Sequence, residues 1–270
     1  MAEKRYTVLM SVYAGEKAEN LRQSIESMIS QTLLPFEFIV VCDGPLGEAL
    51  EDVLQEYEGR IRTVRLRQNA GLGPALREGM KECRTELVLR MDSDDVALPE
   101  RAEKQMAFMC AHPEIDVISC AVKEFCGDTE QISAVRTLPE DDESIRVFAK
   151  KRNPMNHPAV CFRKSAVEKC GGYEPVPYYE DYDLWIRMLM NGCRMANMTE
   201  PLLLMRSDSD FYERRGGRRY LSCTRDFLRR ARDIGFLTRR EYYKSLFVRG
   251  AVNMMPNCLR KVFYKKFLRR

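Results

Sequence analysis

Three aspartates stand close together in this chain of 270 residues. They belong to the run Met91-Asp92-Ser93-Asp94-Asp95. The aspartates directly follow an apolar segment, residues 86–91, which predicts a buried strand. Carboxylates this close repel one another unless a cation or hydrogen-bond donors compensate their charge. On a loop at the end of a strand they are good ligands for Mg²⁺ or Mn²⁺ that also holds a phosphate. A solvated acidic turn before a helix explains the same residues, because Asp favours turns and caps.

A second acidic group, Glu180-Asp181-Tyr182-Asp183, begins an apolar helical pattern. A carboxylate here could take a proton from an attacking hydroxyl if it faced the first group across a crevice. The same position suits an ordinary helix cap. His157, between Asn156 and Pro158, could contact a phosphate or a metal, or it could hydrogen-bond a loop carbonyl. Trp185 fits the core better than a surface that holds a sugar.

Polar residues also follow other apolar runs. Asp43 follows residues 36–42, and its carboxylate could accept the ring N–H of a uracil on which Tyr13 stacks. Asp followed by Gly is equally a good turn. The glycine-containing loop after Arg67 resembles a phosphate-binding loop only loosely. Either Arg67 or Asn69 contacts a diphosphate, or the loop glycines only let the chain enter the next helix tightly.

Alternating strands and helices must position these residues. The first part of the chain predicts strands at 5–13, 36–42, 61–66 and 86–91, with helices that end at Gln31 and that span 46–57 and 73–83. This alternation favours an α/β fold with a mostly parallel sheet and helices on both faces. Ligands of such sheets bind beyond the carboxyl ends of the strands. We therefore expect one crevice to receive Tyr13, Asp43, Asn69 and Asp92 to Asp95.

The next part of the chain predicts a more mixed order of elements. They are a helix at 100–110, a strand at 115–126 with a hairpin partner at 129–138, a helix at 141–151, a strand at 159–162, a helix from Asp181 to Leu189, and two short strands at 195–198 and 202–205. These elements complete an α/β body.

Composition limits the class of protein. Hydrophobic residues make up 45% of the chain and charged residues 31%, which indicates a globular protein. No run approaches the roughly 20 apolar residues that span a bilayer, and the N-terminus has no apolar signal segment, so we expect a cytoplasmic protein. Ten cysteines without a C-x-x-C pair indicate reduced thiols, and two histidines exclude a histidine-rich metal site.

The C-terminal residues differ in charge from the rest. Residues 214–270 hold 18 Lys and Arg against 3 Asp and Glu, a net charge of +15, whereas the remainder carries −11. Apolar residues recur among the basic ones at helical spacing, which predicts two or three basic amphipathic helices broken near Gly235 and Pro256. Such helices could bind an anionic membrane surface, or they could cap the preceding domain with a solvated basic face.

Several short motifs occur in a fixed order. They are Val8 to Tyr13, Val40-Val41-Cys42-Asp43-Gly44, Asn69-x-Gly71-Leu72-Gly73, Met91 to Asp95 with Pro99, and Glu180-Asp181-Tyr182-Asp183-Leu184-Trp185. This ordered set resembles the family-2 glycosyltransferases of the GT-A fold. Asn156-His157-Pro158, Gly171-Gly172-Tyr173 and Glu200-Pro201-Leu202-Leu203 are similar to the branch that makes amylovoran and capsular polysaccharides.

The resemblance covers about residues 6–206. It implies a GT-A catalytic domain at 1–213, with a nucleotide-binding half to about residue 95 and an acceptor-binding half at 96–213. A basic amphipathic helical tail at 214–270 follows.

The resemblance also implies roles for individual residues. The nucleotide-binding residues are Ser11, Tyr13, Asp43, Arg67, Asn69 and Asp92. Asp94 would hold Mn²⁺ or Mg²⁺, and Asp92 and His157 are candidates to join it. Asp181 would be the catalytic base. The acceptor-side residues are Glu180 and Trp185.

The activity that the family implies is an inverting, metal-dependent transfer of a sugar from a UDP-sugar to a saccharide acceptor. Two positions depart from the family pattern: Cys42 replaces the first Asp of an Asp-Asp-Gly turn, and Arg77 stands where Asn is common. Neither removes a group that the chemistry needs. A lipid-linked acceptor in surface-polysaccharide synthesis would place the enzyme at the inner face of the membrane, where residues 214–270 bind anionic lipid. We expect no nucleic-acid partner.

Three other functions compete with this one. A phosphatase with an Asp nucleophile also has D-x-D after an apolar strand, but it normally has Thr or Val at the position of Asp95 and the motif near the first strand. A sugar nucleotidyltransferase would show a glycine-rich loop with Arg and Lys directly after the first strand, which Tyr13-Ala14-Gly15-Glu16 is not. A nucleic-acid-binding module would explain the basic tail, but the acidic body and the lack of a binding motif argue against it.

Overall fold

Four parallel strands form the first half of the central sheet. The computed structural model describes residues 5–207 and 217–254. The strands are β1 (Tyr6–Val12), β2 (Glu37–Cys42), β3 (Arg62–Arg65) and β4 (Leu87–Asp92). They pair in the order β3-β2-β1-β4. The apolar runs of β1, β2 and β4 are buried, as expected for parallel strands that helices cover on both faces.

The second half extends the same sheet in a mixed arrangement. Its strands are β5 (Val96–Ala97), β6 (Val117–Cys126), β7 (Asp128–Arg136), β8 (Cys161–Arg163) and β9 (Met195–Arg206). Beyond β4 the order is β8-β6-β9-β5, and β7 forms a hairpin with β6. β8 runs antiparallel to both β4 and β6, whereas β6 and β9 are parallel. The parts of the chain before and after residue 95 therefore share one sheet.

The structure corrects the sequence prediction at β9. Two short strands are predicted at 195–198 and 202–205, but β9 runs through both. Its register against β6 shifts between Cys120 and Val122, and this irregularity takes up the extra residues around Pro201. The short helix α6 (Lys164–Lys169) and the two-residue β5 also escape prediction, because segments this short carry little periodic signal.

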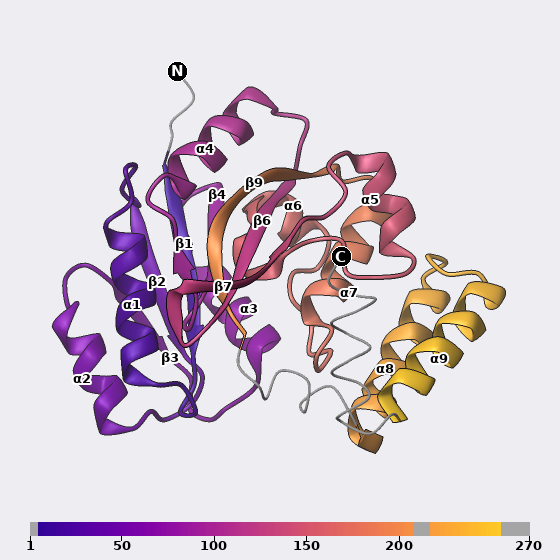
Figure 1. Ribbon diagram of the computed structural model, residues 1–270, viewed down its shortest axis with the longest axis horizontal. Helices are drawn as coiled ribbons and strands as arrows, with labels where there is room; N and C mark the ends of the chain where they lie inside the picture. Colours follow the sequence, from indigo (N-terminus) through magenta and orange to yellow (C-terminus); the bar gives the residue numbers. More distant parts are fainter. Residues whose placement is uncertain (1–4, 208–216, 255–270) are drawn as a thin grey trace.

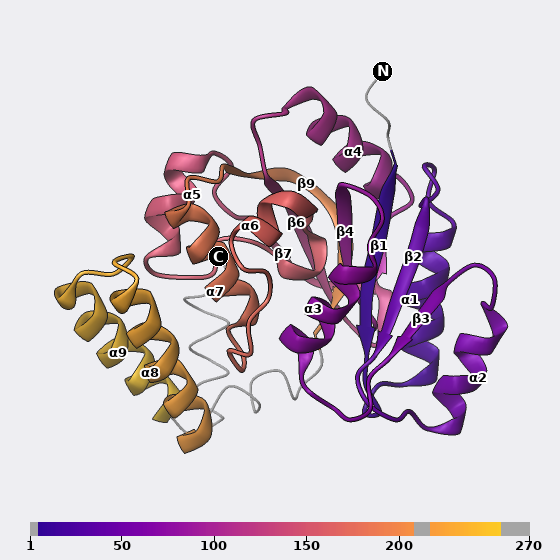
Figure 2. The ribbon, with the colours of Figure 1, turned by 180° about the vertical axis from the view of Figure 1, so that it is seen from behind.

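Helices cover both faces of the sheet (Figures 1 and 2). One face carries α1 (Ala18–Ile29), α2 (Glu48–Glu56) and α4 (Arg101–Ala111), and the other carries α3 (Leu72–Glu82), α5 (Asp142–Ala149), α6 and α7 (Glu180–Met190). Each face has its own hydrophobic core, because strand side chains alternate between the two faces. In β4, Leu89 and Met91 belong to the core on the face of α1, α2 and α4. Val88, Arg90 and Asp92 therefore lie on the face of α3 and α7.

Two further helices, α8 (Gly217–Asp233) and α9 (Arg239–Met254), form a hairpin beside α7. Phe227 of α8 stacks on Tyr179, with ring centroids 4.4 Å apart. The hairpin turns at Gly235, whose φ of +82° is a left-handed conformation that Gly adopts readily. Helices in this part of the chain and the break near Gly235 are confirmed, while Pro256 lies outside the described residues.

Composition also led to expectations about membrane-spanning helices and about the cysteines. Within residues 5–207 and 217–254, no helix is long and apolar enough to cross a membrane. The nine cysteines in these ranges are free thiols.

Gly79 sets how closely α3 approaches the sheet. A Cβ at this position would lie 2.5 Å from Leu9 Cδ1 and 2.6 Å from Val41 Cγ2. We expect Gly79→Ser to lower the free energy of unfolding by about 1–3 kcal/mol, because the added atoms overpack this contact. Gly47→Ser is the matched control, since a Cβ there meets no atom within 4 Å and Ser is a good N-cap for α2. Equal stabilities of the two variants in urea unfolding would contradict this packing.

Candidate active site

The carboxyl ends of β1, β2 and β4 lie at one edge of the sheet. β1 runs from the top of Figure 1 downward, so this edge faces the bottom of the view. Ser11 of β1 lies opposite Val41 of β2 and Asp92 of β4. Tyr13 and Asp43 come directly after their strands. The structure thus brings these predicted residues to the same edge.

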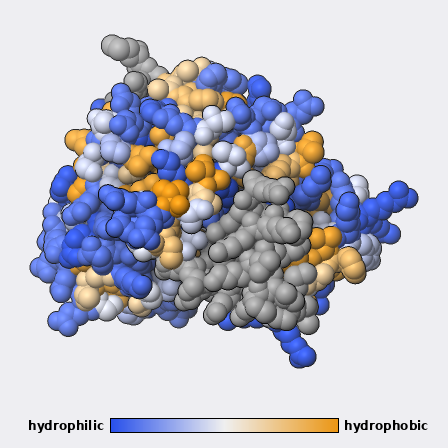
Figure 3. Space-filling model, viewed as in Figure 1, coloured by the Kyte–Doolittle hydropathy of each residue, from blue (hydrophilic) through white to orange (hydrophobic). Residues whose placement is uncertain are grey.

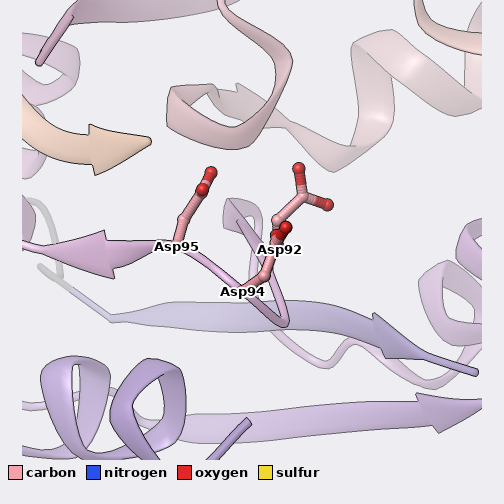
Figure 4. A group of neighbouring side chains, drawn as sticks. All are labelled: Asp92, Asp94 and Asp95. Carbon is pink, nitrogen blue, oxygen red and sulfur yellow. The ribbon is translucent and has the colours of Figure 1, made fainter. Parts of the chain in front are cut away.

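Asp92, Asp94 and Asp95 form a group at the end of β4 (Figure 4). The oxygens that could serve as ligands, one from each residue, lie within 4.8 Å of one another. Asp95 is buried, and its Oδ1 accepts a hydrogen bond of 2.8 Å from the Arg206 N–H. Its Oδ2 has no hydrogen-bond partner among the described residues. Oxygen ligands this close, one of them buried and unpaired, fit a hard divalent cation such as Mg²⁺ or Mn²⁺.

Burial and repulsion from neighbouring carboxylates disfavour the charged forms of Asp94 and Asp95. Burial, with the charges of Asp92 and Glu16, raises the pKa of Asp94 to about 7, although the charge of Arg90 opposes this. Burial also raises the pKa of Asp95 well above its usual value, and the charges of Asp94 and Asp92 add to the rise. A divalent cation would relieve the repulsion, and it would compete with protons for the same oxygens.

Arg90 is a buried cation that acts on both acidic groups. It lies two residues before Asp92 on the same face of β4, is 1% exposed, and forms an ion pair with Asp92. Its charge also opposes the rise in the pKa of Asp94 and of Glu180. Its Nε and Nη1 have no hydrogen-bond partner among the residues described. Sequence reasoning missed Arg90, although a single Arg in an apolar strand signals a buried ion pair.

Arg206, at the end of β9, holds the loop that carries the acidic cluster. Besides its backbone bond to Asp95, its Nε donates to the Asp94 carbonyl oxygen at 2.9 Å. Its Nη2 donates to Gln23 Oε1 of α1, also at 2.9 Å. The loop is therefore joined to both β9 and α1. Sequence reasoning missed Arg206 because its partners lie far away along the chain.

Asp181, the predicted catalytic base, is the second residue of α7. Its Oδ2 accepts a hydrogen bond of 2.5 Å from Asn153 Nδ2, and its Oδ1 accepts one of 2.7 Å from the Tyr182 N–H. The N-cap of α7 is Tyr179, so Asp181 is not the cap that its sequence position also suited. The amide of Asn153 therefore orients this carboxylate.

Glu180 of the second acidic group interacts electrostatically with Asp92 of the first. Burial, together with the charge of Asp181, raises the pKa of Glu180 to about 7. The charge of Asp92 contributes to this rise, and Arg90 opposes it. The start of α7 therefore lies within electrostatic reach of the acidic cluster, as the prediction of a shared crevice requires.

The Asp43 carboxylate holds the loop that follows β3 through hydrogen bonds. Its two carboxylate oxygens accept hydrogen bonds from the N–H groups of Ala70, at 2.7 Å, and Gly71, at 3.0 Å. Asn69 Nδ2 donates to the Asp43 carbonyl oxygen at 3.3 Å. Asp43 is buried, whereas the predicted nucleotide-binding residues Tyr13, Arg67 and Asn69 are exposed. Each carboxylate oxygen can accept a second bond, so the nucleobase contact of Asp43 stays a prediction.

Two predicted site residues lie in the core. His157 Nε2 is 2.9 Å from the Tyr173 hydroxyl oxygen, and burial lowers the pKa of the ring well below its usual value. His157 is not part of the acidic cluster in the described residues, so the metal contact predicted for it does not fit. Trp185 is 0% exposed and lies edge-on to His157. An acceptor cannot touch a side chain this buried, so the acceptor-side position predicted for Trp185 does not fit either.

Comparison with known families identifies the kind of enzyme. Residues 7–171 match the family described as Glycosyl transferase family 2. The chain is a family 2 glycosyltransferase. This glycosyltransferase is 36% identical to the amylovoran biosynthesis glycosyltransferase AmsE of Erwinia amylovora, over 97% of this chain and 98% of AmsE. It is 31% identical to the UDP-Gal:alpha-D-GlcNAc-diphosphoundecaprenol beta-1,3-galactosyltransferase of Escherichia coli, over 98% of this chain and 97% of that protein.

Two solved structures share the fold of this glycosyltransferase. S. aureus TarS in complex with UDP-GlcNAc has a TM-score of 0.68 at 16% identity, over 97% of this chain and 76% of that one. Mannosyltransferase PcManGT from Pyrobaculum calidifontis, in complex with GDP-Man and Mn²⁺, has a TM-score of 0.63 at 17% identity, over 95% of this chain and 71% of that one. These likenesses confirm a GT-A-like fold.

The raised pKa of Asp94 predicts how metal binding and stability depend on pH. Mn²⁺ must displace the proton from this carboxyl group, so we expect its apparent affinity to fall about tenfold per pH unit below the pKa of about 7. Without metal, stability changes in the opposite sense. The fold disfavours the ionised form, so stability from this group falls as the pH rises from the ordinary pKa of 3.8 to about 7.

Melting temperatures of the wild type and Asp94→Asn, with and without Mn²⁺ at about pH 5.5 and about pH 8, check this dependence. The wild type should gain stability from Mn²⁺ mainly at the higher pH. Asp94→Asn should gain little at either pH, because it lacks the charged ligand. An equal gain of the wild type at both pH values would show that Asp94 does not bind the metal.

The ion pair of Arg90 and Asp92 should make their substitutions non-additive. Asp92→Asn leaves a buried cation without its carboxylate but also relieves repulsion within the acidic cluster, so we expect a loss of roughly 1–3 kcal/mol in the free energy of unfolding. Adding Arg90→Met removes that cation, so the double variant should lose less than the two single losses together. Arg101→Met is the matched control, because Arg101 is equally buried but bonds to Gln105 and to the Arg90 carbonyl oxygen. Its loss should add to that of Asp92→Asn. Additive losses for Arg90 and Asp92 in urea unfolding would rule out the ion pair.

Proposed function

We propose that this glycosyltransferase moves a sugar from a UDP-sugar to a hydroxyl group of a saccharide acceptor, with inversion at the anomeric carbon. The reaction uses Mg²⁺ or Mn²⁺ and belongs to the synthesis of a bacterial surface polysaccharide. One observation carries the proposal: in a family 2 glycosyltransferase, the carboxylates of residues 92–95 lie at the carboxyl edge of the sheet, within electrostatic reach of the acid pair that begins α7.

The donor would lie along the carboxyl ends of β1, β2 and β4. The residues that would contact its nucleotide are Ser11, Tyr13, Asp43, Arg67, Asn69 and Asp92. Asp94, with Asp92 and Asp95, would hold the divalent ion. When bound, the ion neutralises charge that develops on the leaving diphosphate. The fit of the carboxylate oxygens to such an ion supports this arrangement.

Asp181 would act as the catalytic base. Its carboxylate takes the proton of the acceptor hydroxyl while the hydroxyl oxygen bonds to the anomeric carbon. The bond from that carbon to the diphosphate oxygen breaks in the same step, so a single displacement inverts the configuration. The hydrogen bond from Asn153 positions the carboxylate before the acceptor arrives. Glu180, which precedes Asp181, would lie on the acceptor side.

The acceptor would be a saccharide on a lipid carrier. The name of the E. coli relative specifies an acceptor linked to diphosphoundecaprenol. Residues 214–270 carry a net charge of +15, and an anionic membrane surface attracts each nearby Lys or Arg by about 1 kcal/mol. The enzyme would therefore work at the inner face of the cell membrane, peripherally bound through these residues, without a nucleic-acid partner.

Asp181→Asn should separate the chemical step from donor binding. A positioned base contributes about 10²- to 10⁴-fold in rate, so turnover should fall by that factor because an amide cannot take the proton. Binding of UDP with Mn²⁺ should stay within about twofold of the wild type, because Asp181 does not hold the donor. UDP release is measured over a panel of UDP-sugars with a synthetic saccharide diphospholipid, and UDP binding by calorimetry.

Asp52→Asn is the matched control, because Asp52 is exposed on α2, on the other face of the sheet. It should leave both measurements unchanged. Full turnover by Asp181→Asn would exclude Asp181 as the base. Loss of UDP binding in Asp181→Asn would instead place this residue in the donor site.

A further inference from the structure

A groove lies between α8 and α9, where α8 begins and α9 ends. Its volume is about 560 Å³, which is within the range of small-molecule sites. Its walls include Arg218, Leu221 and Arg225 of α8, and Leu246, Phe247 and Gly250 of α9. The surface is mostly apolar with two arginines on one wall, and no acidic side chain from the described residues lines it. Such a surface suits a ligand with both a hydrocarbon part and an anionic part.

Large apolar side chains of α9 are exposed around this groove. Phe247 is 77% exposed, Tyr243 65% and Val248 51%. Figure 3 shows apolar and hydrophilic surface side by side on the hairpin, at the right of the view. Neighbouring exposed apolar side chains mark a surface that a partner covers. Residues 217–254 hold ten Lys and Arg against three Asp and Glu, so an anionic partner is favoured.

Gly250 keeps the groove open. A Cβ at this position would meet only Leu221 Cδ1 within 4 Å, at 3.7 Å, so a longer side chain would extend into the groove. Gly within a helix costs about 1 kcal/mol relative to Ala, so α9 would be more stable with a side chain here. The wall of the groove is therefore low at this point because Gly250 has no side chain.

Helix α8, which forms one wall of the groove, also contacts the residues that precede α7. Tyr220, next to Leu221 in α8, contacts the rings of Tyr178 and Tyr179 at centroid distances of 5.0 and 5.9 Å. These tyrosines directly precede the acid pair of α7. Tyr178 has a φ of +68°, a strained conformation that the surrounding packing must hold. In Figure 1 the start of α8 and the end of α9 lie at the bottom, the end of the molecule to which the carboxyl edge of the sheet also points.

We infer that this groove binds the lipid carrier of the acceptor, a long-chain prenyl diphosphate, and so holds the attached saccharide near Asp181. The inference rests on the proposed function. The apolar walls take the first part of the hydrocarbon chain, while Arg218 and Arg225 pair with the diphosphate through charge-assisted hydrogen bonds. A carrier in the membrane then reaches the enzyme at the same end of the molecule as the donor crevice.

Farnesyl diphosphate is a water-soluble probe that has both parts of this ligand. In calorimetry on the full chain with EDTA, which prevents binding through a metal, it should bind at least about tenfold more tightly than inorganic diphosphate or farnesol. Gly250→Leu should weaken this binding at least about tenfold by filling the groove, and the variant should fold because Leu favours helix more than Gly does. Arg225→Gln should also weaken it. Arg229→Gln is the matched control, because both arginines are exposed on α8 and pair with Asp226, but only Arg225 lines the groove.

Several results would overturn the inference. Unchanged binding of farnesyl diphosphate to Gly250→Leu would show that the groove is not the site. Equal affinity of the wild type for inorganic diphosphate and farnesyl diphosphate would show that the hydrocarbon part of the ligand is not recognised. Binding to phosphatidylglycerol vesicles without binding of the probe would indicate a general membrane contact. A wild-type dimer that Gly250→Leu disrupts would indicate a contact between two copies.

UDP binding with Mn²⁺ separates this inference from the proposed function. If UDP binds normally and the probe does not bind, only the groove is assigned wrongly. If UDP does not bind, the proposed donor site fails, whatever the probe does.

Discussion

The repulsion among Asp92, Asp94 and Asp95 is the constraint on which the rest of the crevice depends. Three carboxylates with oxygens within 4.8 Å of one another destabilise a fold unless positive charge or hydrogen-bond donors lie nearby. Arg90 supplies a buried positive charge from β4, and the backbone N–H of Arg206 at the end of β9 donates to the Asp95 carboxylate. The compensation is incomplete, because the pKa of Asp94 still rises to about 7. A divalent cation would complete such a site, which is why we propose that the acidic cluster holds one.

One continuous sheet supports both acidic groups. The sheet continues from β4 through β8 and β6 to β9, so the loop after β4 and the end of β9 belong to one frame. α7 packs on the face of this sheet that carries Arg90, and Asn153 holds the carboxylate of Asp181 in place. A frame of this kind suits a displacement in which two bound substrates must meet within bonding distance.

Local pattern predicts much of this fold, whereas the site depends on contacts between distant residues. Apolar runs that alternate with helical spacing predict the first four strands, and the rule that ligands bind at the carboxyl ends of parallel strands places Asp43 and Asp92 at one edge. No periodic pattern links Arg206 to the loop that it holds. His157 and Trp185 are residue types common in sites, but packing under α7 buries them, and burial of this kind arises only in the folded chain.

The most direct test of the metal and nucleotide site is a calorimetric titration of UDP into the wild type and into Asp94→Asn, each with Mn²⁺ and with EDTA. We predict that Mn²⁺ strengthens UDP binding to the wild type by at least about tenfold, because the ion joins the carboxylates to the diphosphate. Asp94→Asn should lose that gain. UDP binding of equal strength with and without Mn²⁺, or an undiminished gain in Asp94→Asn, would contradict the assignment of the acidic cluster as the metal site.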